Sequence, residues 1–144
     1  RPIRAALEAA DTLAPGTRAR QGGTLMGFSN GAYFAAEVAC SEPGRWTGLV
    51  LIAMKLDLDP ARLRRAGVTR VVLAAGDRVE KRVSMRAQAA RLEAGGVEAQ
   101  FTSLGDVGHA FPGDRSDRMC GAIAWVRHAP AEACGARGAS TPSK

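Results

Sequence analysis

Ser29 is the clearest candidate for chemistry in this 144-residue chain, because glycines bracket it in the G-x-S-x-G stretch Gly27–Gly31. The apolar residues before it predict a strand over Thr24 to Phe28, and those after it predict a helix that ends near Cys40. A chain that turns directly from strand to helix needs glycines, and it holds the intervening serine in a strained conformation with its hydroxyl exposed. Such a serine can attack a carbonyl, and the alternative interpretation is a turn serine that caps the helix.

A serine hydroxyl becomes a nucleophile when a neighbouring base removes its proton, and the chain has two histidines that could do this. His109 follows Gly108 in a loop after a predicted strand, so it is the candidate general base. His128 lies at the predicted end of the last helix, where a cation suits the helix dipole and a surface role is expected. The sequence therefore favours a Ser29–His109 pair.

A carboxylate that orients the histidine could come from either of two residues. Asp77 follows Gly76 directly after the predicted buried strand Val71–Ala75, and it is the first candidate. Glu80 is the alternative acid. Asp106 is a poorer candidate, since it suits a turn between the glycines that surround it.

The segment from Ile3 to Val126 resembles the C-terminal half of an α/β-hydrolase. The resemblance rests on the chain order serine, acid, histidine and on the G-x-S-x-G sequence around Ser29, which in that fold forms a sharp turn called the nucleophile elbow. The segment is most similar to small esterases of the dienelactone hydrolase and polyhydroxyalkanoate depolymerase kind. The resemblance implies a serine hydrolase that acts on a small-molecule carboxylic ester through an acyl-serine intermediate, with the backbone N–H of Asn30 in the oxyanion hole. It implies neither a cofactor nor a metal.

The acid departs from the pattern of these esterases. Their carboxylate usually stands three residues beyond the glycine in a G-x-x-D sequence, and that position is Val79 here. Asp77 and Glu80 are each displaced from it. The displacement motivates an alternative function, a non-catalytic hydrolase-like domain used for binding or assembly.

Four apolar runs of strand length alternate with helical patterns, which predicts an α/β fold with a three-layer, doubly wound, mostly parallel sheet. The expected strands are Thr24 to Phe28, Gly48 to Ala53, Val71 to Ala75 and Val97 to Leu104. The expected helices are one near Ile3 to Leu13, the helix after Ser29, Ala61 to Ala66 after an Asp59-Pro60 cap, one capped by Ser84 and ending at Gly95, and Ser116 to His128.

The domain is expected to cover residues 1–128, with a disordered tail over 129–144. Complete α/β-hydrolases have about twice as many strands, so we expect a partial fold that lacks the N-terminal strands. The strand before Ser29 would then form an exposed sheet edge. A missing N-terminal segment of a longer chain, which we favour, or a second chain could pair with that edge.

Composition excludes some classes of protein. The net charge is +6, from 20 Lys and Arg against 14 Asp and Glu, but the basic residues are scattered, aromatic residues are few and nucleic-acid motifs are not apparent. No apolar run approaches the roughly 20 residues of a membrane span. We therefore expect neither a nucleic acid nor a membrane as partner, and the compartment stays open between export and cytoplasm.

The cysteines and the aromatic residues near the predicted site could serve either the core or a specific function. Cys40 and Cys120 are expected to be small core residues, although one disulfide among the three cysteines is possible. Tyr33, Phe34, Phe111 and Pro112 could shape an acyl pocket, but a core role is the favoured interpretation. The loop from Met54 to Leu58 follows the second strand on the side of the sheet where ligands of such folds bind.

Overall fold

The computed structural model describes residues 22–111 and 117–129, together with residues 5, 8, 9, 12 and 13. The predicted helix near the N-terminus lies outside this part of the chain, apart from those isolated positions. The predicted tail over 129–144, apart from Ala129, and Pro112 also lie outside it. Four parallel strands form one sheet in the order β1-β2-β3-β4. The strands are β1 Gly23–Phe28, β2 Trp46–Ile52, β3 Arg70–Ala75 and β4 Glu98–Ser103.

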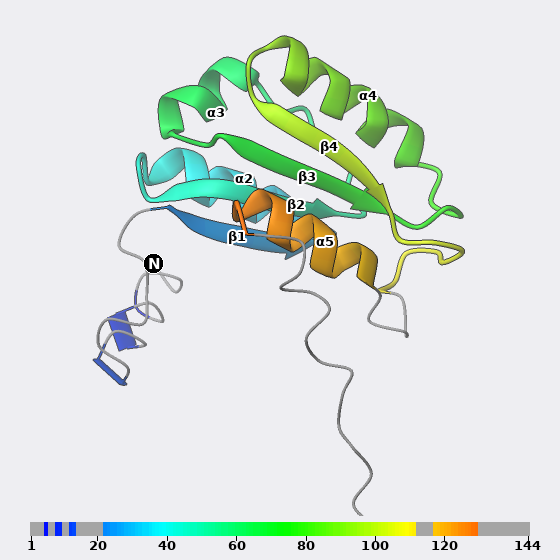
Figure 1. Ribbon diagram of the computed structural model, residues 1–144, viewed down its shortest axis with the longest axis horizontal. Coiled ribbons are helices and arrows are strands. Elements are labelled where there is room, and N and C mark those ends of the chain that lie inside the picture. The colour runs from blue at the N-terminus through cyan, green and yellow to red at the C-terminus, as the bar shows by residue number, and fades with distance from the viewer. Residues whose placement is uncertain (1–4, 6–7, 10–11, 14–21, 112–116, 130–144) are drawn as a thin grey trace, which may run out of the picture.

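Helices follow each strand and cover both faces of the sheet (Figure 1). Helices α2, α3 and α4 pack against one face, and α5 crosses the other face. Their bounds are α2 Asn30–Ser41, α3 Pro60–Ala66, α4 Arg82–Ala94 and α5 Asp117–Val126. The predicted doubly wound α/β architecture is therefore confirmed in the described residues.

Alternating residues of the central strands point to opposite faces of the sheet and belong to two separate hydrophobic cores. Leu49, Leu51 and Leu73 pack under α2, α3 and α4, whereas their neighbours Val50 and Ile52 pack under α5. A strand covered on both faces must be apolar at every position, which explains the continuous hydrophobic runs of β2 and β3.

Two predicted helix ends differ from the structure. Ser84 does not cap α4, because this helix begins at Arg82 after Lys81, and the Ser84 hydroxyl donates instead to the Lys81 carbonyl at 2.8 Å. The last helix ends at Val126 rather than at His128, which has a positive φ of 54°. A residue in the left-handed region cannot continue a right-handed helix.

Polar contacts fix the outer elements to one another. Gln88 of α4 is buried, and its side-chain amide exchanges two hydrogen bonds with the backbone of Leu58, at 3.0 and 3.3 Å. Arg62 of α3 makes a bidentate pair with Glu37 of α2, at 2.8 and 2.9 Å. The Arg62 hydrogen bonds lower the pKa of the Glu37 carboxyl group. These contacts tie the loop after β2 and the short helix α3 to the helices beside them.

β1 is an edge strand, as the sequence predicts. Within the described residues it pairs with β2 alone, and its burial is lower than that of β2 or β3. Met26 at its centre is 55% exposed. The backbone groups on the outer edge of β1 and the exposed Met26 side chain thus offer a place for a further strand.

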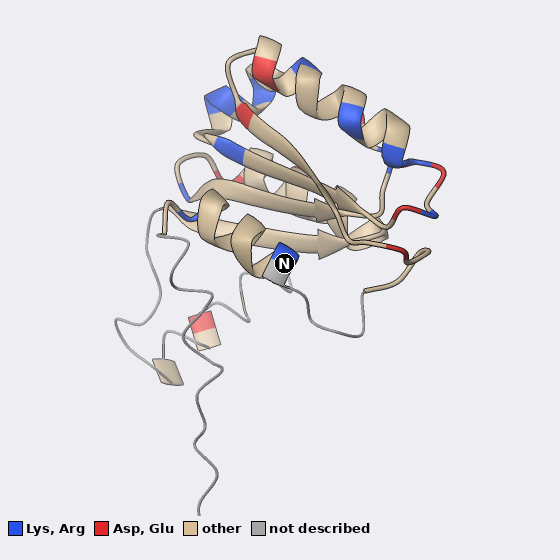
Figure 2. Ribbon diagram, turned by 45° about the vertical axis from the view of Figure 1, so that its right-hand side comes forward, with Lys and Arg blue, Asp and Glu red and all other residues tan. Residues whose placement is uncertain are grey.

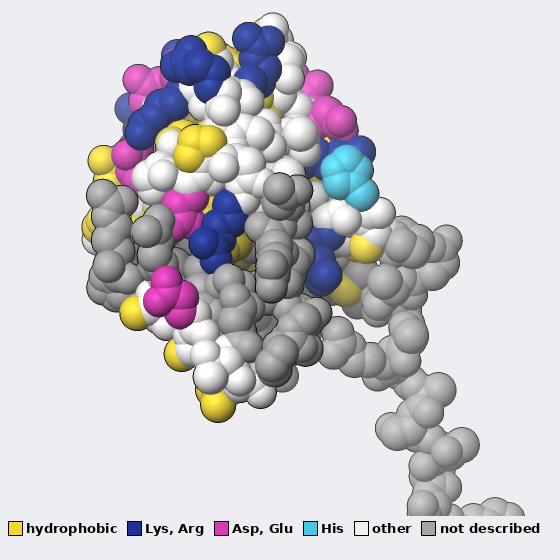
Figure 3. Space-filling model, turned by 90° about the vertical axis from the view of Figure 1, so that its left-hand side faces the viewer, with side chains coloured by type: hydrophobic (Ala, Val, Ile, Leu, Met, Phe, Trp, Pro, Cys, Tyr) yellow, Lys and Arg dark blue, Asp and Glu magenta, His cyan; other side chains and the backbone are white. Residues whose placement is uncertain are grey.

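Charged residues are spread over the outer helices and loops (Figure 2). On the face drawn in Figure 3, basic side chains are interspersed with acidic and apolar ones. Among the described helices, none is both long enough and apolar enough to span a bilayer.

Candidate active site

Ser29 lies in the turn between β1 and α2, in a conformation that an ordinary serine avoids. Its φ is 53° and its ψ is −125°. This backbone costs about 1 to 3 kcal/mol for a residue with a Cβ atom. Hydrogen bonds from Ser29 N to Ile52 O, at 2.8 Å, and from Ala32 N to Ser29 O, at 2.9 Å, hold the turn in place. The alternative interpretation of Ser29 as a helix cap is not supported, because its side chain makes no capping hydrogen bond to α2.

The two glycines of the motif have different roles. A Cβ atom on Gly27 would lie 2.2 Å from the carbonyl oxygen of Gly31, so the end of the strand and the first turn of the helix meet there. A Cβ atom on Gly31 would meet no described atom within 4 Å apart from its chain neighbours and the backbone of its own helix. Close backbone contact therefore explains the first glycine, and the described residues impose no such limit on the second.

His109 is placed beside Ser29 by a loop from the far side of the sheet. Its Nε2 atom lies 3.0 Å from Ser29 Oγ, across a sequence separation of 80 residues. The imidazole also packs against Phe28, with ring centroids 5.0 Å apart. This geometry allows the serine hydroxyl to donate its proton to a neutral imidazole.

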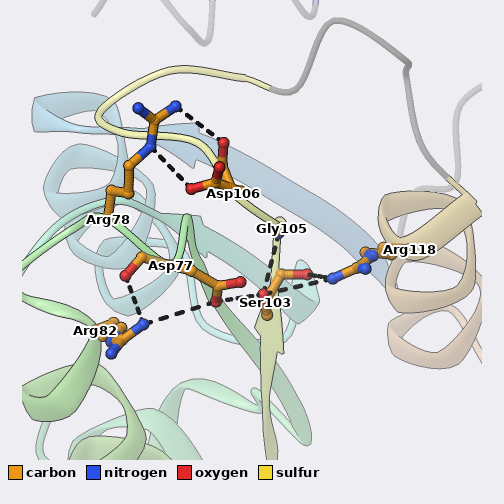
Figure 4. A network of polar contacts seen from close by, with 7 residues as sticks. All are labelled: Asp77, Arg78, Arg82, Ser103, Gly105, Asp106 and Arg118. Carbon is orange, nitrogen blue, oxygen red and sulfur yellow. Dashed lines mark hydrogen bonds and ion pairs between the residues drawn. The ribbon is translucent and has the colours of Figure 1, made fainter.

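The structure places Asp77 in the loop after β3, where its carboxylate is already engaged. Asp77 Oδ1 accepts a hydrogen bond from the Ser103 hydroxyl at 2.7 Å, and a guanidinium nitrogen of Arg82 lies 3.9 Å from the same oxygen. Figure 4 shows this network. Within the described residues, no carboxylate makes a hydrogen bond or an ion pair with His109.

The other acids at this end of the sheet lie apart from the Ser29–His109 pair. Glu80 is exposed in the loop before α4. Asp106 pairs with Arg78 at 3.0 Å, as a turn residue of the loop that carries His109. Val79, at the position where related esterases carry the acid, is buried in the core under α2, α3 and α4.

The backbone N–H of Asn30 lies at the first position of α2, immediately after Ser29. The first N–H groups of a helix have no acceptor within the helix, and they lie at the positive end of its dipole. This donor is therefore suited to an oxyanion that forms beside Ser29. The Asn30 side chain is exposed.

Four aromatic side chains lie near these residues, and the favoured prediction for three of them is wrong. Tyr33 and Phe34 are 49% and 60% exposed, and Phe111 is 48% exposed, so none is a core residue. Phe111 stacks at 5.0 Å on Phe28, which contacts His109. An exposed aromatic surface thus adjoins the histidine.

A pocket of about 300 Å³ lies between α2, α3 and the loop after β2. Tyr33 lines it, one helical turn after Ser29, together with Lys55 and the Glu37–Arg62 pair. Lys55 to Leu58, from the loop predicted to face a ligand, also contribute to its wall. The loop therefore borders a hollow beside the elbow helix.

The cysteine prediction holds in part. Cys40 is free and half-buried, and burial raises the pKa of its thiol. Cys120 is disulfide-bonded, so its interpretation as an unpaired core residue is wrong. Among the described residues, no three His, Cys, Asp or Glu side chains are placed to bind a metal ion.

Sequence reasoning missed Ser103 and Arg82, which contact the Asp77 carboxylate, and Arg118, which contacts Ser103. Ser103 is 26 residues from Asp77, and the two meet because β3 and β4 are paired in register. An isolated serine at the end of a strand gives no pattern that could reveal this contact.

Comparison with known proteins identifies the fold. No family model matches the chain, and no curated protein matches its sequence. Among solved structures, it is similar to FphF, a fluorophosphonate-binding serine hydrolase of Staphylococcus aureus, with 14% identity and a TM-score of 0.65, over 87% of this chain and 62% of that one. It is also similar to SOBER1 of Arabidopsis thaliana, with 13% identity and a TM-score of 0.59, over 88% and 61% of the two chains.

A third similar structure is that of esterase PE8, with 22% identity and a TM-score of 0.60, over 86% of this chain and 59% of that one. The chain thus spans about three fifths of the length of the structures it matches. At these identities the likeness establishes the fold, a partial α/β-hydrolase fold, as the resemblance of the sequence implied.

Proposed function

We propose that this chain, with its partial α/β-hydrolase fold, is a serine hydrolase that cleaves carboxylic esters through an acyl-serine intermediate. The observation that carries the proposal is the 3.0 Å distance between Ser29 Oγ and His109 Nε2, with Ser29 held in a strained turn. Strained backbone persists where the surrounding structure enforces it, and it concentrates at functional sites. The names of two similar structures, a serine hydrolase and an esterase, are consistent with this class of reaction.

In the proposed reaction, Ser29 Oγ attacks the ester carbonyl while its proton passes to His109 Nε2. The tetrahedral intermediate then collapses, the bond to the alkoxide oxygen breaks, and His109 returns the proton to the leaving alcohol. Water attacks the acyl-serine with His109 again as the base, which releases the acid and restores the serine. The backbone N–H of Asn30 stabilises the negative charge on the carbonyl oxygen.

The carboxylate of the proposed triad is Asp77, with Glu80 as the alternative. Asp77 Oδ1 is bound by Ser103, and its other carboxylate oxygen, Oδ2, makes no hydrogen bond in the described part of the chain. That oxygen is the one available to orient the imidazole. An acid in this role fixes the tautomer of the histidine and stabilises the imidazolium.

Exchanging each acid for its amide identifies the partner of His109. We expect Asp77→Asn to lower kcat for a p-nitrophenyl ester by about a hundredfold or more, because loss of the carboxylate leaves the imidazolium less stabilised. Glu80→Gln serves as the matched control and should keep kcat within about twofold. The reverse pattern of kcat values would assign the acid to Glu80.

A non-catalytic domain is the second candidate function. It is favoured by the lack of a hydrogen bond between His109 and any described carboxylate, and by the exposed aromatic surface beside the histidine. Such a domain would keep the fold and the elbow but would bind a partner through the exposed Phe34 and Phe111 side chains. It would not react with mechanism-based probes.

A fluorophosphonate probe separates the two candidates, since it reacts with activated serines and spares ordinary ones. For an enzyme, we expect one adduct in the intact mass of the protein, on the tryptic peptide that carries Ser29. An unlabelled chain would contradict an autonomous enzyme. If a longer protein is labelled where this chain is not, the site needs further segments.

We propose that such a segment, or a second chain, extends the sheet at β1. The support is the outer edge of β1, which pairs with no strand in the described part of the chain, the exposure of Met26 and the length of the similar structures. A parallel strand would satisfy the backbone groups of this edge. It could also bring a second N–H donor to the oxyanion beside Asn30.

A further inference from the structure

Ser103, the last residue of β4, connects the loop that carries Asp77 with the loop that carries His109 (Figure 4). Its hydroxyl donates to Asp77 Oδ1 at 2.7 Å and accepts from the backbone N–H of Gly105 at 3.0 Å. This one hydroxyl thus donates a hydrogen bond to the Asp77 loop and accepts one from the His109 loop. A hydroxyl can do both, whereas a methyl group can do neither.

Two arginines from different helices add charge to this connection. Arg82 of α4 donates to the backbone carbonyl of Asp77 and lies 3.9 Å from its carboxylate. Arg118 of α5 approaches Ser103 from the opposite side, with its guanidinium 3.4 Å from the backbone oxygen and 3.5 Å from the hydroxyl. Hydrogen bonds to charged groups are stronger than neutral ones, so the carboxylate is a firm anchor for Ser103.

The two loops also touch along their backbones. Asp77 N donates to Gly105 O at 2.8 Å, and Arg78 N donates to Val107 O at 3.2 Å. Gly76 lies so close to the second loop that an added Cβ atom would be 2.1 Å from Val107 O. These backbone contacts between the two loops end at Val107, two residues before His109.

The histidine itself has few contacts that could hold it. It is exposed, and its recorded side-chain contacts are the hydrogen bond to Ser29 and the packing against Phe28. Gly105, at the start of its loop, has a φ of 83°, a conformation that glycine adopts without the strain that a Cβ atom would impose. The position of the imidazole therefore depends on how firmly this loop is tied to the loop of Asp77.

We propose that Ser103 is a positioning residue of the active site, which fixes the position of the His109 loop relative to the Asp77 carboxylate. The inference rests on the proposed function, because it concerns the geometry of the Ser29–His109 pair. It does not depend on whether Asp77 or Glu80 is the acid, since Ser103 acts on the loop of His109 directly through Gly105. Without the hydroxyl, Gly105 N–H loses its acceptor and the loop can shift away from Ser29.

The test compares Ser103→Ala with Ser103→Thr, which keeps the hydroxyl. We expect Ser103→Ala to lower kcat for a p-nitrophenyl ester by about ten- to a hundredfold, since displacements of about 1 Å have effects of this size. KM should stay within about twofold, because Ser103 does not contact substrate. Ser103→Thr should restore most of kcat, and the rate of fluorophosphonate labelling should follow kcat in all variants.

Thr102→Val provides a matched control on the adjacent residue of the same strand. The Thr102 hydroxyl makes no recorded hydrogen bond to any described residue, so its loss should leave kcat unchanged. Urea unfolding of each variant shows whether a fall in kcat follows a loss of folded protein. Equal losses of kcat in Ser103→Ala and Thr102→Val, or a Ser103→Ala variant as active as the parent, would overturn the positioning role.

The Ser29→Ala variant separates this failure from failure of the proposed function. If Ser29→Ala abolishes hydrolysis while Ser103→Ala does not affect it, only the role of Ser103 is wrong. If Ser29→Ala retains full hydrolysis, or if the parent protein neither hydrolyses esters nor reacts with the probe, the proposed function is wrong and the inference falls with it.

Discussion

Ser29→Ala is expected to lower kcat for ester hydrolysis by at least about a thousandfold, because no other group can form the acyl intermediate once Oγ is gone. The measurement is the steady-state hydrolysis of a p-nitrophenyl ester, with fluorophosphonate labelling of the same preparations. Residual hydrolysis would come from direct attack of water on the bound ester, with the Asn30 N–H stabilising the oxyanion. The proposed acyl-serine mechanism predicts that labelling disappears entirely.

Ser41→Ala is the matched control for the loss of one hydroxyl. Ser41 ends α2, the helix that Ser29 precedes, and its hydroxyl donates to the Val38 carbonyl at the surface. We expect this variant to keep its activity and its probe adduct. Equal hydrolysis by the Ser29→Ala variant and the parent protein would contradict the nucleophile assignment.

A third substitution at this position measures the strain of the turn. Glycine adopts a φ of 53° without the cost that a Cβ atom imposes, so Ser29→Gly should be more stable than Ser29→Ala by about 1 kcal/mol. Both variants lack the nucleophile, so both should be inactive. Inactive but folded variants would show that the serine serves chemistry rather than stability.

Gly27→Ala is expected to destabilise the protein by about 3 to 5 kcal/mol, the second large effect that the structure predicts. The new methyl group would lie 2.2 Å from Gly31 O and 2.5 Å from Ala32 N, which are backbone atoms that cannot move without opening the first turn of α2. The free energy of unfolding in urea measures this directly. Where the variant still folds, probe labelling should be lost, because the turn must open to admit the methyl group.

Gly31→Ala, the other glycine of the same motif, provides the control. Apart from its chain neighbours and the backbone of its own helix, no described atom lies within 4 Å of the added Cβ. Gly31 lies in helix α2, where alanine is favoured over glycine by up to about 1 kcal/mol. We expect unchanged or slightly raised stability. Equal destabilisation by both substitutions would show that the steric argument for Gly27 is wrong.

Much of the fold could be predicted from the sequence because its signals are local. The apolar runs of β2 and β3 identify buried parallel strands, and the Asp59-Pro60 pair marks the start of α3, where Asp59 accepts a hydrogen bond from Ala61 N. The glycines around Ser29 indicated the candidate nucleophile, and the glycine-bracketed loop after the last strand indicated the candidate base. Both residues follow parallel strands, whose carboxyl ends lie at the same edge of the sheet, and the loop after β4 brings His109 to 3.0 Å from Ser29.

Errors arose where competing local features were equally plausible. Ser84 resembles a helix cap, but α4 starts two residues earlier and uses that hydroxyl within its first turn. Tyr33 and Phe34 are aromatic residues of the kind found in cores, but both lie on the exposed side of α2. Hydrophobicity identifies what can be buried, and only the arrangement of elements decides which face is covered.

The sequence by itself indicated the candidate nucleophile, the candidate base and the alternating strands and helices, because each depends on residues close together in the chain. Tertiary structure decided what surrounds the acid. Asp77 contacts Ser103 and Arg82, and Ser103 in turn contacts Arg118. Ser103 and Arg118 come from β4 and α5, which follow Asp77 in the chain. Such contacts depend on register and on side-chain direction across paired strands, and no spacing along one chain encodes them.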